Sequence, residues 1–211
     1  MKTTPLALSL LATTLATAQS TEPFYNITST PFNLVVTSAD GTINTTLAAC
    51  HVGAALESLC LSANVSPPNP GSSSPSVFNF NTSTYSQAPE PTLGTPGILT
   101  WILQAASMNV SSSAYFNYDP TTDIALPILE PGSARPQIVA FDLQNRLTLQ
   151  GSVDYTVQPP QPGVYREFYR WYACETYFAS YRYVNLAWKL GPGEPENQSC
   201  VAVNVTRIFV A

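Results

Sequence analysis

Short segments in which apolar and polar side chains alternate recur along the chain. A period of two places successive side chains on opposite faces of an extended backbone, so this pattern predicts half-buried β-strands. The alternating segments lie at residues 32–36, 43–47, 78–81 and 201–209, and similar short apolar runs lie at 98–103, 124–129, 138–141 and 147–149.

Clusters of proline, glycine and serine separate these segments, and none is long enough to be an interdomain linker. The sequence also has no internal repeat. We therefore predict one all-β domain over residues 32–211, a two-sheet antiparallel sandwich of jelly-roll type, preceded by an extended segment at 19–31. The first and last strong strands, Phe32–Thr37 and Val201–Val210, are expected to lie side by side and close the fold.

The first 18 residues have the features of a signal peptide. Lys2 supplies one positive charge, residues 5–15 form a short apolar run, and Ala16-Thr17-Ala18 is a small-x-small cleavage signal. A membrane span needs roughly 20 apolar residues, which is more than this run offers. Seven N-glycosylation acceptors follow, which predict a secreted eukaryotic glycoprotein. They are Asn26, Asn44, Asn64, Asn81, Asn109, Asn197 and Asn204. Asn44, Asn81 and Asn204 fall on the polar face of their expected strands, and the other four are expected in loops or termini.

The four cysteines predict two disulfides, because an even number in a secreted chain is typical of an oxidised framework. Three connectivities are possible. Short sequence separations favour Cys50–Cys60 and Cys174–Cys200 over the other two.

Residues 47–61 are open to two interpretations. Apolar residues recur there at helical spacing, but a helix would place the α-carbons of Cys50 and Cys60 about 15 Å apart. A disulfide needs at most about 7 Å, so a helix and a local disulfide exclude each other. Gly53 interrupts the helical pattern, and we favour a hairpin closed by Cys50–Cys60.

Composition narrows the range of partners. The chain carries 8 basic and 13 acidic residues, a net charge of −5, and loss of Lys2 with the leader would make it −6. An acidic chain without a basic cluster argues against nucleic acid and anionic membrane surfaces. No second apolar stretch or C-terminal anchor signal follows, so we expect no membrane anchor. Only 10% of residues are charged, so solubility must come from uncharged polar side chains and glycans.

The aromatic stretch at residues 165–188 has two interpretations. A strand over residues 165–178 would present Tyr169, Trp171 and Tyr177 on one face, with Arg166, Phe168 and Arg170 on the other, and a second strand would follow at residues 184–190. Exposed aromatic rings can stack on sugar rings, which makes Tyr169, Trp171 and Tyr177 candidates for carbohydrate binding. The alternative is that the rings build the core and cover the arginines, and we favour that alternative.

The sequence offers little for catalysis or for cofactors. His51 is the single histidine, and a nucleophile elbow, zinc-ligand spacing and nucleotide-binding loops are absent. We therefore expect no metal or cofactor. Glu167 and Glu175 would lie about 26 Å apart on one straight strand, too far for the paired carboxylates of a glycosidase. A partner from a neighbouring strand is conceivable, with Asp142, Asp154 and Glu57 as candidates.

Four segments carry a family resemblance. They are FNLVVTSADGTINTTLAACHVGAALESLCL, GILTWIL, RWYACETYFASYRYVNLAWKLG and PENQSCVAVNVTRIFV. Together they resemble a family of secreted filamentous-fungal proteins built on a domain of unknown function. The layout is also distantly similar to phialide-type fungal cell-wall proteins. Both resemblances imply an extracellular fungal context, and neither implies an active site.

The hypothesis from sequence is a secreted, N-glycosylated, non-catalytic fungal protein of the cell surface or extracellular space that binds cell-wall or plant polysaccharide. A secreted glycoside hydrolase with two carboxylates is the first alternative, and a protein that interacts with a host is the second.

Overall fold

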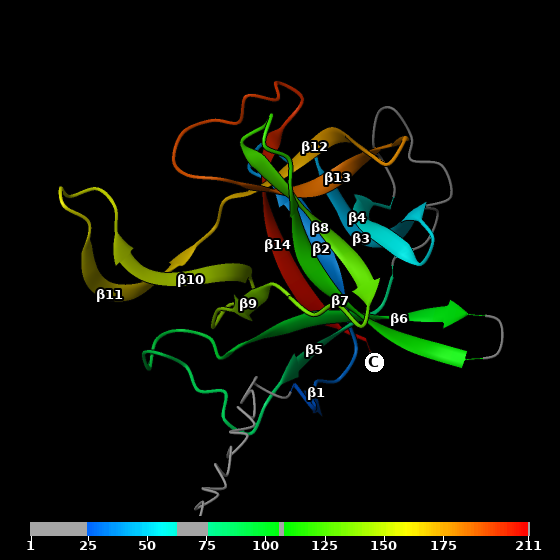
Figure 1. Ribbon diagram of the computed structural model, residues 1–211, viewed down its shortest axis with the longest axis horizontal. Helices are drawn as coiled ribbons and strands as arrows, with labels where there is room; N and C mark the ends of the chain where they lie inside the picture. The colour runs from blue at the N-terminus through cyan, green and yellow to red at the C-terminus, as the bar shows by residue number, and fades with distance from the viewer. Residues whose placement is uncertain (1–24, 63–75, 106–107, 211) are drawn as a thin grey trace, which may run out of the picture.

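The structure is a computed structural model that describes residues 25–62, 76–105 and 108–210 (Figure 1). The expected signal peptide and Asn64 lie outside these residues. Within the described ranges no helix has the length and hydrophobicity needed to cross a bilayer. The strands are β1 (Ile27–Thr28), β2 (Phe32–Ser38), β3 (Asn44–Gly53), β4 (Leu56–Leu61), β5 (Phe78–Thr82), β6 (Pro96–Ala105), β7 (Met108–Tyr118), β8 (Ile124–Pro131), β9 (Ile138–Phe141), β10 (Leu147–Asp154), β11 (Gln161–Phe168), β12 (Trp171–Phe178), β13 (Tyr181–Lys189) and β14 (Val201–Phe209).

All strand pairings are antiparallel and join the strands into one 14-stranded sheet. Its order is β1-β5-β2-β14-β12-β13-β4-β8-β7-β6-β9-β10-β11, and β3 pairs with β2 and β4. The sheet curls back on itself, because β5 also pairs with β6 and Arg146 bridges to Thr206 of β14. The predicted all-β class and the two disulfides are confirmed. The strands that were expected to form two sheets are joined by hydrogen bonds into one continuous sheet.

Strand β2 shows how the alternating pattern builds the core. Phe32, Leu34 and Val36 are completely buried, whereas the residues between them are partly exposed. Burial of each such side chain stabilises the folded state by roughly 1.5–3 kcal/mol. β2 pairs with β14, and Val36 lies opposite Val205 in their register. The predicted adjacency of the first and last strong strands is therefore confirmed.

The segment at residues 47–61 is a hairpin, as favoured above. β3 and β4 pair antiparallel, and Cys50 and Cys60 form a disulfide with their α-carbons 5.9 Å apart. The second disulfide, Cys174–Cys200, ties β12 to the segment that precedes β14. Both predicted pairings are confirmed, and the helical interpretation is excluded.

Two expectations from sequence were wrong. Asn109, expected in a loop, lies in β7. The strand expected over residues 165–178 is interrupted, because β11 ends at Phe168 and β12 begins at Trp171. β11 pairs with β10, whereas β12 pairs with β13 and β14, so the two halves of the stretch belong to different parts of the sheet.

The β10–β11 hairpin projects from the body of the protein, on the left in Figure 1. The loop that precedes β6 packs closely against its base. A side chain at Gly94 would place its Cβ 1.9 Å from the carbonyl oxygen of Phe141 in β9, so only glycine fits there. This close approach lets the Gly94 amide donate a hydrogen bond to Glu167 of β11, at 3.3 Å.

Candidate functional site

The structure separates the three aromatic residues proposed for carbohydrate binding. Trp171 is 2% exposed and packs in the core, where its Nε1 donates to the Leu147 carbonyl at 2.8 Å. A buried ring cannot stack on a sugar, so Trp171 does not belong to a carbohydrate platform. Its packing fits the alternative weighed above, in which the rings build the core.

Tyr177 is 70% exposed, and it lies near the end of β12, whereas Tyr169 precedes that strand. It lines a pocket of about 280 Å³ together with the glycosylation acceptor Asn197. Tyr169 does not line this pocket, so Tyr177 and Tyr169 do not form one carbohydrate platform.

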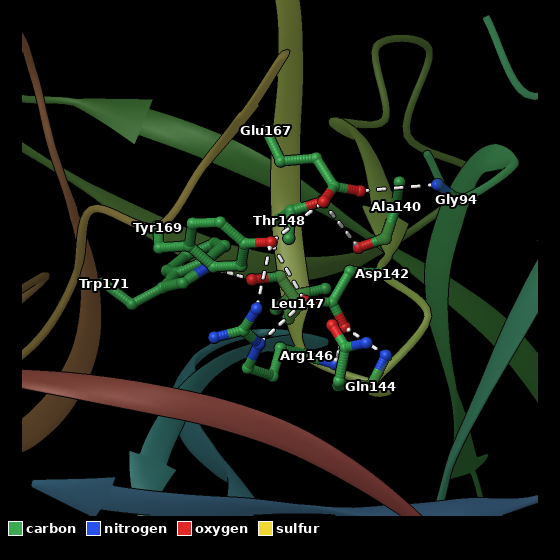
Figure 2. Close-up of polar contacts among 10 residues, drawn as sticks. All are labelled: Gly94, Ala140, Asp142, Gln144, Arg146, Leu147, Thr148, Glu167, Tyr169 and Trp171. Carbon is green, nitrogen blue, oxygen red and sulfur yellow. Dashed lines mark hydrogen bonds and ion pairs between the residues drawn. The ribbon is translucent and has the colours of Figure 1, made fainter. Parts of the chain in front are cut away.

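Tyr169 is the centre of a polar cluster with Asp142, Arg146 and Glu167, which we call the Tyr169 cluster (Figure 2). Its hydroxyl lies 2.9 Å from Oδ2 of Asp142 and 2.8 Å from Oε2 of Glu167. The Arg146 guanidinium lies over the Tyr169 ring, 4.6 Å from its centre. Burial, followed by hydrogen bonds to Glu167 and Asp142, raises the pKa of Tyr169 well above its ordinary value, so the phenol stays protonated.

Asp142 is held by the turn that joins β9 to β10. One carboxylate oxygen accepts the backbone amides of Gln144 and Arg146, at 2.9 and 2.7 Å. The other accepts Nε of Arg146 at 2.7 Å and the Tyr169 hydroxyl. Burial acts to raise the pKa of Asp142, but these hydrogen bonds outweigh it and hold the pKa below the ordinary range. The carboxylate is ionised and fully partnered.

The Tyr169 cluster contains two carboxylates, as the site of a glycosidase would. Asp142 and Glu167 contact the same hydroxyl oxygen at 2.9 and 2.8 Å, so these carboxylate oxygens are at most 5.7 Å apart. That separation is compatible with a retaining mechanism, which needs about 5–5.5 Å. However, Asp142 is 5% exposed, and the Tyr169 hydroxyl lies between the two carboxylates where a glycosidic oxygen would have to bind. The arrangement is suited to holding β11 against the β9–β10 turn.

The other candidate carboxylates have their own partners. Glu175 forms an ion pair with Arg182, and Asp154 with Arg166 at 4.0 Å. Glu57 lies 3.6 Å from His51 on the β3–β4 hairpin. Of the carboxylates considered from sequence, the structure therefore brings only Asp142 to Glu167.

Replacement of Asp142 with asparagine is expected to lower the free energy of unfolding by roughly 2–3 kcal/mol at neutral pH, because hydrogen bonds to a charged group are lost. The folded pKa of Asp142 lies below its unfolded value, so its contribution is present above about pH 4 and is lost as the pH falls through the folded pKa. Urea unfolding of both proteins from pH 7 to pH 3 should show the difference shrinking in acid.

Asp154→Asn is the matched control, because Asp154 is more exposed than Asp142, its hydrogen bonds from Thr156 are open to solvent and its ion pair with Arg166 is long. It should change stability little. A stability difference for Asp142→Asn that stays constant down to pH 3 would contradict the role assigned to the ionised carboxylate.

The opposite face of the β10–β11 hairpin forms a groove of about 630 Å³, which we call the hairpin groove. Phe168, Arg166 and Arg170 line it from one side, and Tyr155, Trp188 and the Gly191-Pro192 turn contribute to the remainder. The guanidinium carbons of Arg166 and Arg170 lie 5.0 and 5.1 Å from the centre of the Phe168 ring. Arg170 has no carboxylate within ion-pair distance among the residues that the structure describes.

The groove combines the chemistry that sugars require. Aromatic faces pack against the C–H groups of a pyranose, and guanidinium groups donate hydrogen bonds to its hydroxyls. The volume lies within the range of small-ligand sites. The sequence placed Arg166, Phe168 and Arg170 on one face and favoured aromatic rings that cover the two arginines, and the Phe168 ring does contact both guanidinium groups. Tyr155, which is 77% exposed on the segment between β10 and β11, was not predicted from the sequence.

The glycosylation acceptors in the described ranges differ in accessibility. The amide of Asn197 donates to the Glu175 carbonyl at 2.9 Å, and that of Asn81 to the Tyr25 carbonyl at 3.4 Å. Both side chains are partly buried. The exposed acceptors are Asn26, Asn44, Asn109 and Asn204.

These features define an antiparallel all-β protein with two disulfides and a groove lined by aromatic and arginine side chains. The chain belongs to a family defined by a domain of unknown function, DUF7907, which matches residues 29–209. No curated protein and no solved structure shows a significant match to the chain.

Proposed function

We propose that the protein is a secreted, N-glycosylated fungal protein of the cell surface or extracellular space that binds cell-wall or plant polysaccharide without cleaving it. The observation that carries this proposal is the hairpin groove, which is lined by the exposed Tyr155 ring and by Phe168 with the guanidinium groups of Arg166 and Arg170 in contact with it. The leader, the exposed glycosylation acceptors and the two disulfides support the extracellular location.

The arrangement of the carboxylates supports binding rather than hydrolysis. Asp142 lies in the β9–β10 turn and Glu167 on β11, and neither lines the hairpin groove. A glycosidase site would need both at the bound sugar, one to protonate the leaving oxygen and the other to attack or to activate water.

The test incubates deglycosylated protein with insoluble chitin, β-glucan, xylan or mannan and measures, in the same tubes, depletion from the supernatant and release of soluble sugar. We expect depletion by at least one polysaccharide and no release. Phe168→Ala and Arg170→Ala should each weaken binding by about tenfold, equivalent to about 1.4 kcal/mol, because each removes one direct contact.

Tyr177→Ala is the matched control, because it removes an exposed aromatic ring outside the groove. Phe168→Leu keeps an apolar side chain at the position and separates loss of stacking from loss of packing. Release of soluble sugar would favour the hydrolase and redirect attention to Asp142 and Glu167.

A protein partner, such as one on a host, is the second candidate. Apolar side chains on the projecting hairpin are exposed, including Val164 at 76% and Tyr155 at 77%. Exposed apolar surface of this kind can mark a protein interface. Absence of depletion by all four polysaccharides would favour this alternative.

A further inference from the structure

A second pocket, of about 520 Å³, lies apart from the hairpin groove. We call it the Arg207 pocket. Phe80 and Thr82 of β5, Phe141 of β9 and Arg207 of β14 line it, together with residues of the segment between β5 and β6. It shares no lining residue with the hairpin groove.

Arg207 is held in place by contacts that leave its charge without a counter-ion. Its guanidinium carbon lies 4.3 Å from the centre of the Phe141 ring and 5.1 Å from that of Phe209. Nε donates to the side-chain oxygen of Asn145 at 2.9 Å. No ion pair within the described ranges includes Arg207. An arginine has four further N–H donors on its terminal nitrogens, which suit a bidentate contact with a carboxylate.

The surroundings of Arg207 disfavour an unpaired cation. Burial lowers the pKa of its guanidinium, which means that the charge is partly removed from water. A buried charge is stabilised most effectively by an opposite charge that also hydrogen-bonds to it. An anion bound in the pocket would provide that partner.

The rest of the pocket wall indicates what kind of anion fits. It contains no acidic residue, and five hydroxyl-bearing residues line it: Thr82, Ser83, Thr84, Ser86 and Thr95. Ser83 and Ser86 are hydrogen-bonded within their own turn, which fixes that part of the wall. The Phe80 and Phe141 rings are 7% and 4% exposed, so they form part of the pocket wall but offer no free face for stacking. Hydroxyl-bearing residues and one cation together match a ligand with a carboxylate and several hydroxyls.

We propose that the Arg207 pocket binds a sugar acid of the uronate type, with the carboxylate on Arg207 and the ring hydroxyls on the threonine side chains. The volume falls within the usual range for small-ligand sites. The net charge of −5 repels anions at long range, so affinity depends on the local contact with Arg207. This site is independent of the polysaccharide groove proposed above, because the two share no residues.

The test is isothermal titration calorimetry of deglycosylated protein with galacturonate and with neutral galactose at low ionic strength. We expect galacturonate to bind at least about tenfold more tightly than galactose, since hydrogen bonds to a charged group are the stronger ones. The Nε–H resonance of Arg207 in ¹H–¹⁵N spectra should shift on titration with galacturonate. Equal affinity for the two sugars, or no binding of galacturonate, would overturn the proposal.

Variants assign the effect to the pocket. Arg207→Gln should weaken galacturonate binding by about tenfold or more, whereas Arg135→Gln removes the same charge from an exposed site and should leave it unchanged. Thr95→Val removes a wall hydroxyl without touching the packing of Arg207, so it tests the pocket if Arg207→Gln folds poorly. Unchanged affinity in Arg207→Gln would refute the assignment.

Titration with an oligogalacturonate distinguishes the two sources of a uronate. Tighter binding of the oligomer than of the monomer identifies a polysaccharide as the source. Equal binding identifies a free sugar acid. In both cases the carboxylate contact with Arg207 stands.

Discussion

Replacement of Trp171 with alanine is expected to lower the free energy of unfolding by about 3–5 kcal/mol, the range for truncation of a large buried aromatic side chain. The Trp171 ring packs edge-to-face against Trp188, with centres 4.9 Å apart, and against Phe116 at 6.1 Å. Its Nε1 also donates to the Leu147 carbonyl, which would lose its partner. Urea unfolding of deglycosylated protein, followed by circular dichroism, measures the change.

Two variants show whether the loss comes from packing. Trp171→Phe keeps an aromatic ring and should be less damaging than Trp171→Ala. Tyr177→Ala removes an exposed ring and should change stability by less than about 0.5 kcal/mol. If Trp171→Ala bound polysaccharide less well at unchanged stability, the assignment of Trp171 to the core would be wrong.

Removal of the Cys174–Cys200 disulfide, by replacing both cysteines with alanine, is expected to cause the second large loss in the free energy of unfolding. The disulfide closes a loop between residues 26 positions apart, and the entropy of that closure predicts a loss of about 3.5 kcal/mol. The cross-link fixes β12 to the segment that leads into β14, which in turn pairs with β2. Thermal unfolding should shift to lower temperature by several degrees.

The Cys50–Cys60 disulfide is the internal comparison, because it closes a loop between residues only ten apart. Its removal should cost less, about 2.8 kcal/mol by the same relation. A larger loss for the short loop than for the long one would show that local packing, and not chain entropy, dominates both disulfides.

The parts of the fold that could be predicted are those with a strong local pattern. Alternation in β2 and β14 predicted two strands that proved to be neighbours. Disulfide geometry selected the β3–β4 hairpin over a helix. The sequence did not predict β7, because serine occupies positions where an apolar residue would indicate burial. Ser112, for example, is 1% exposed, although serine is usually found at the surface.

The candidate sites could be predicted only in fragments. Asp142 and Glu167 are 25 residues apart in sequence, and they meet because a break at Tyr169–Arg170 ends β11 beside the β9–β10 turn. Because of the same break, the Trp171 side chain points into the core, whereas Phe168 lines the groove. Arg207 was not predicted as a site residue, because the alternation of apolar and polar residues in β14 does not indicate the pocket that β5 and β9 help to form. Such sites depend on tertiary contacts that local periodicity does not encode.

The position of β11 has a consequence for solubility. β11 is the last strand in the sheet order, and within the described residues it pairs with β10 alone, so its other edge is free to recruit a strand from another molecule. Pro162 has no amide hydrogen to offer such a strand, and Arg166 and Glu167 place charges along the same edge. These residues disfavour pairing of β11 with a strand from another molecule. The hairpin can therefore extend into solvent without promoting edge-to-edge aggregation.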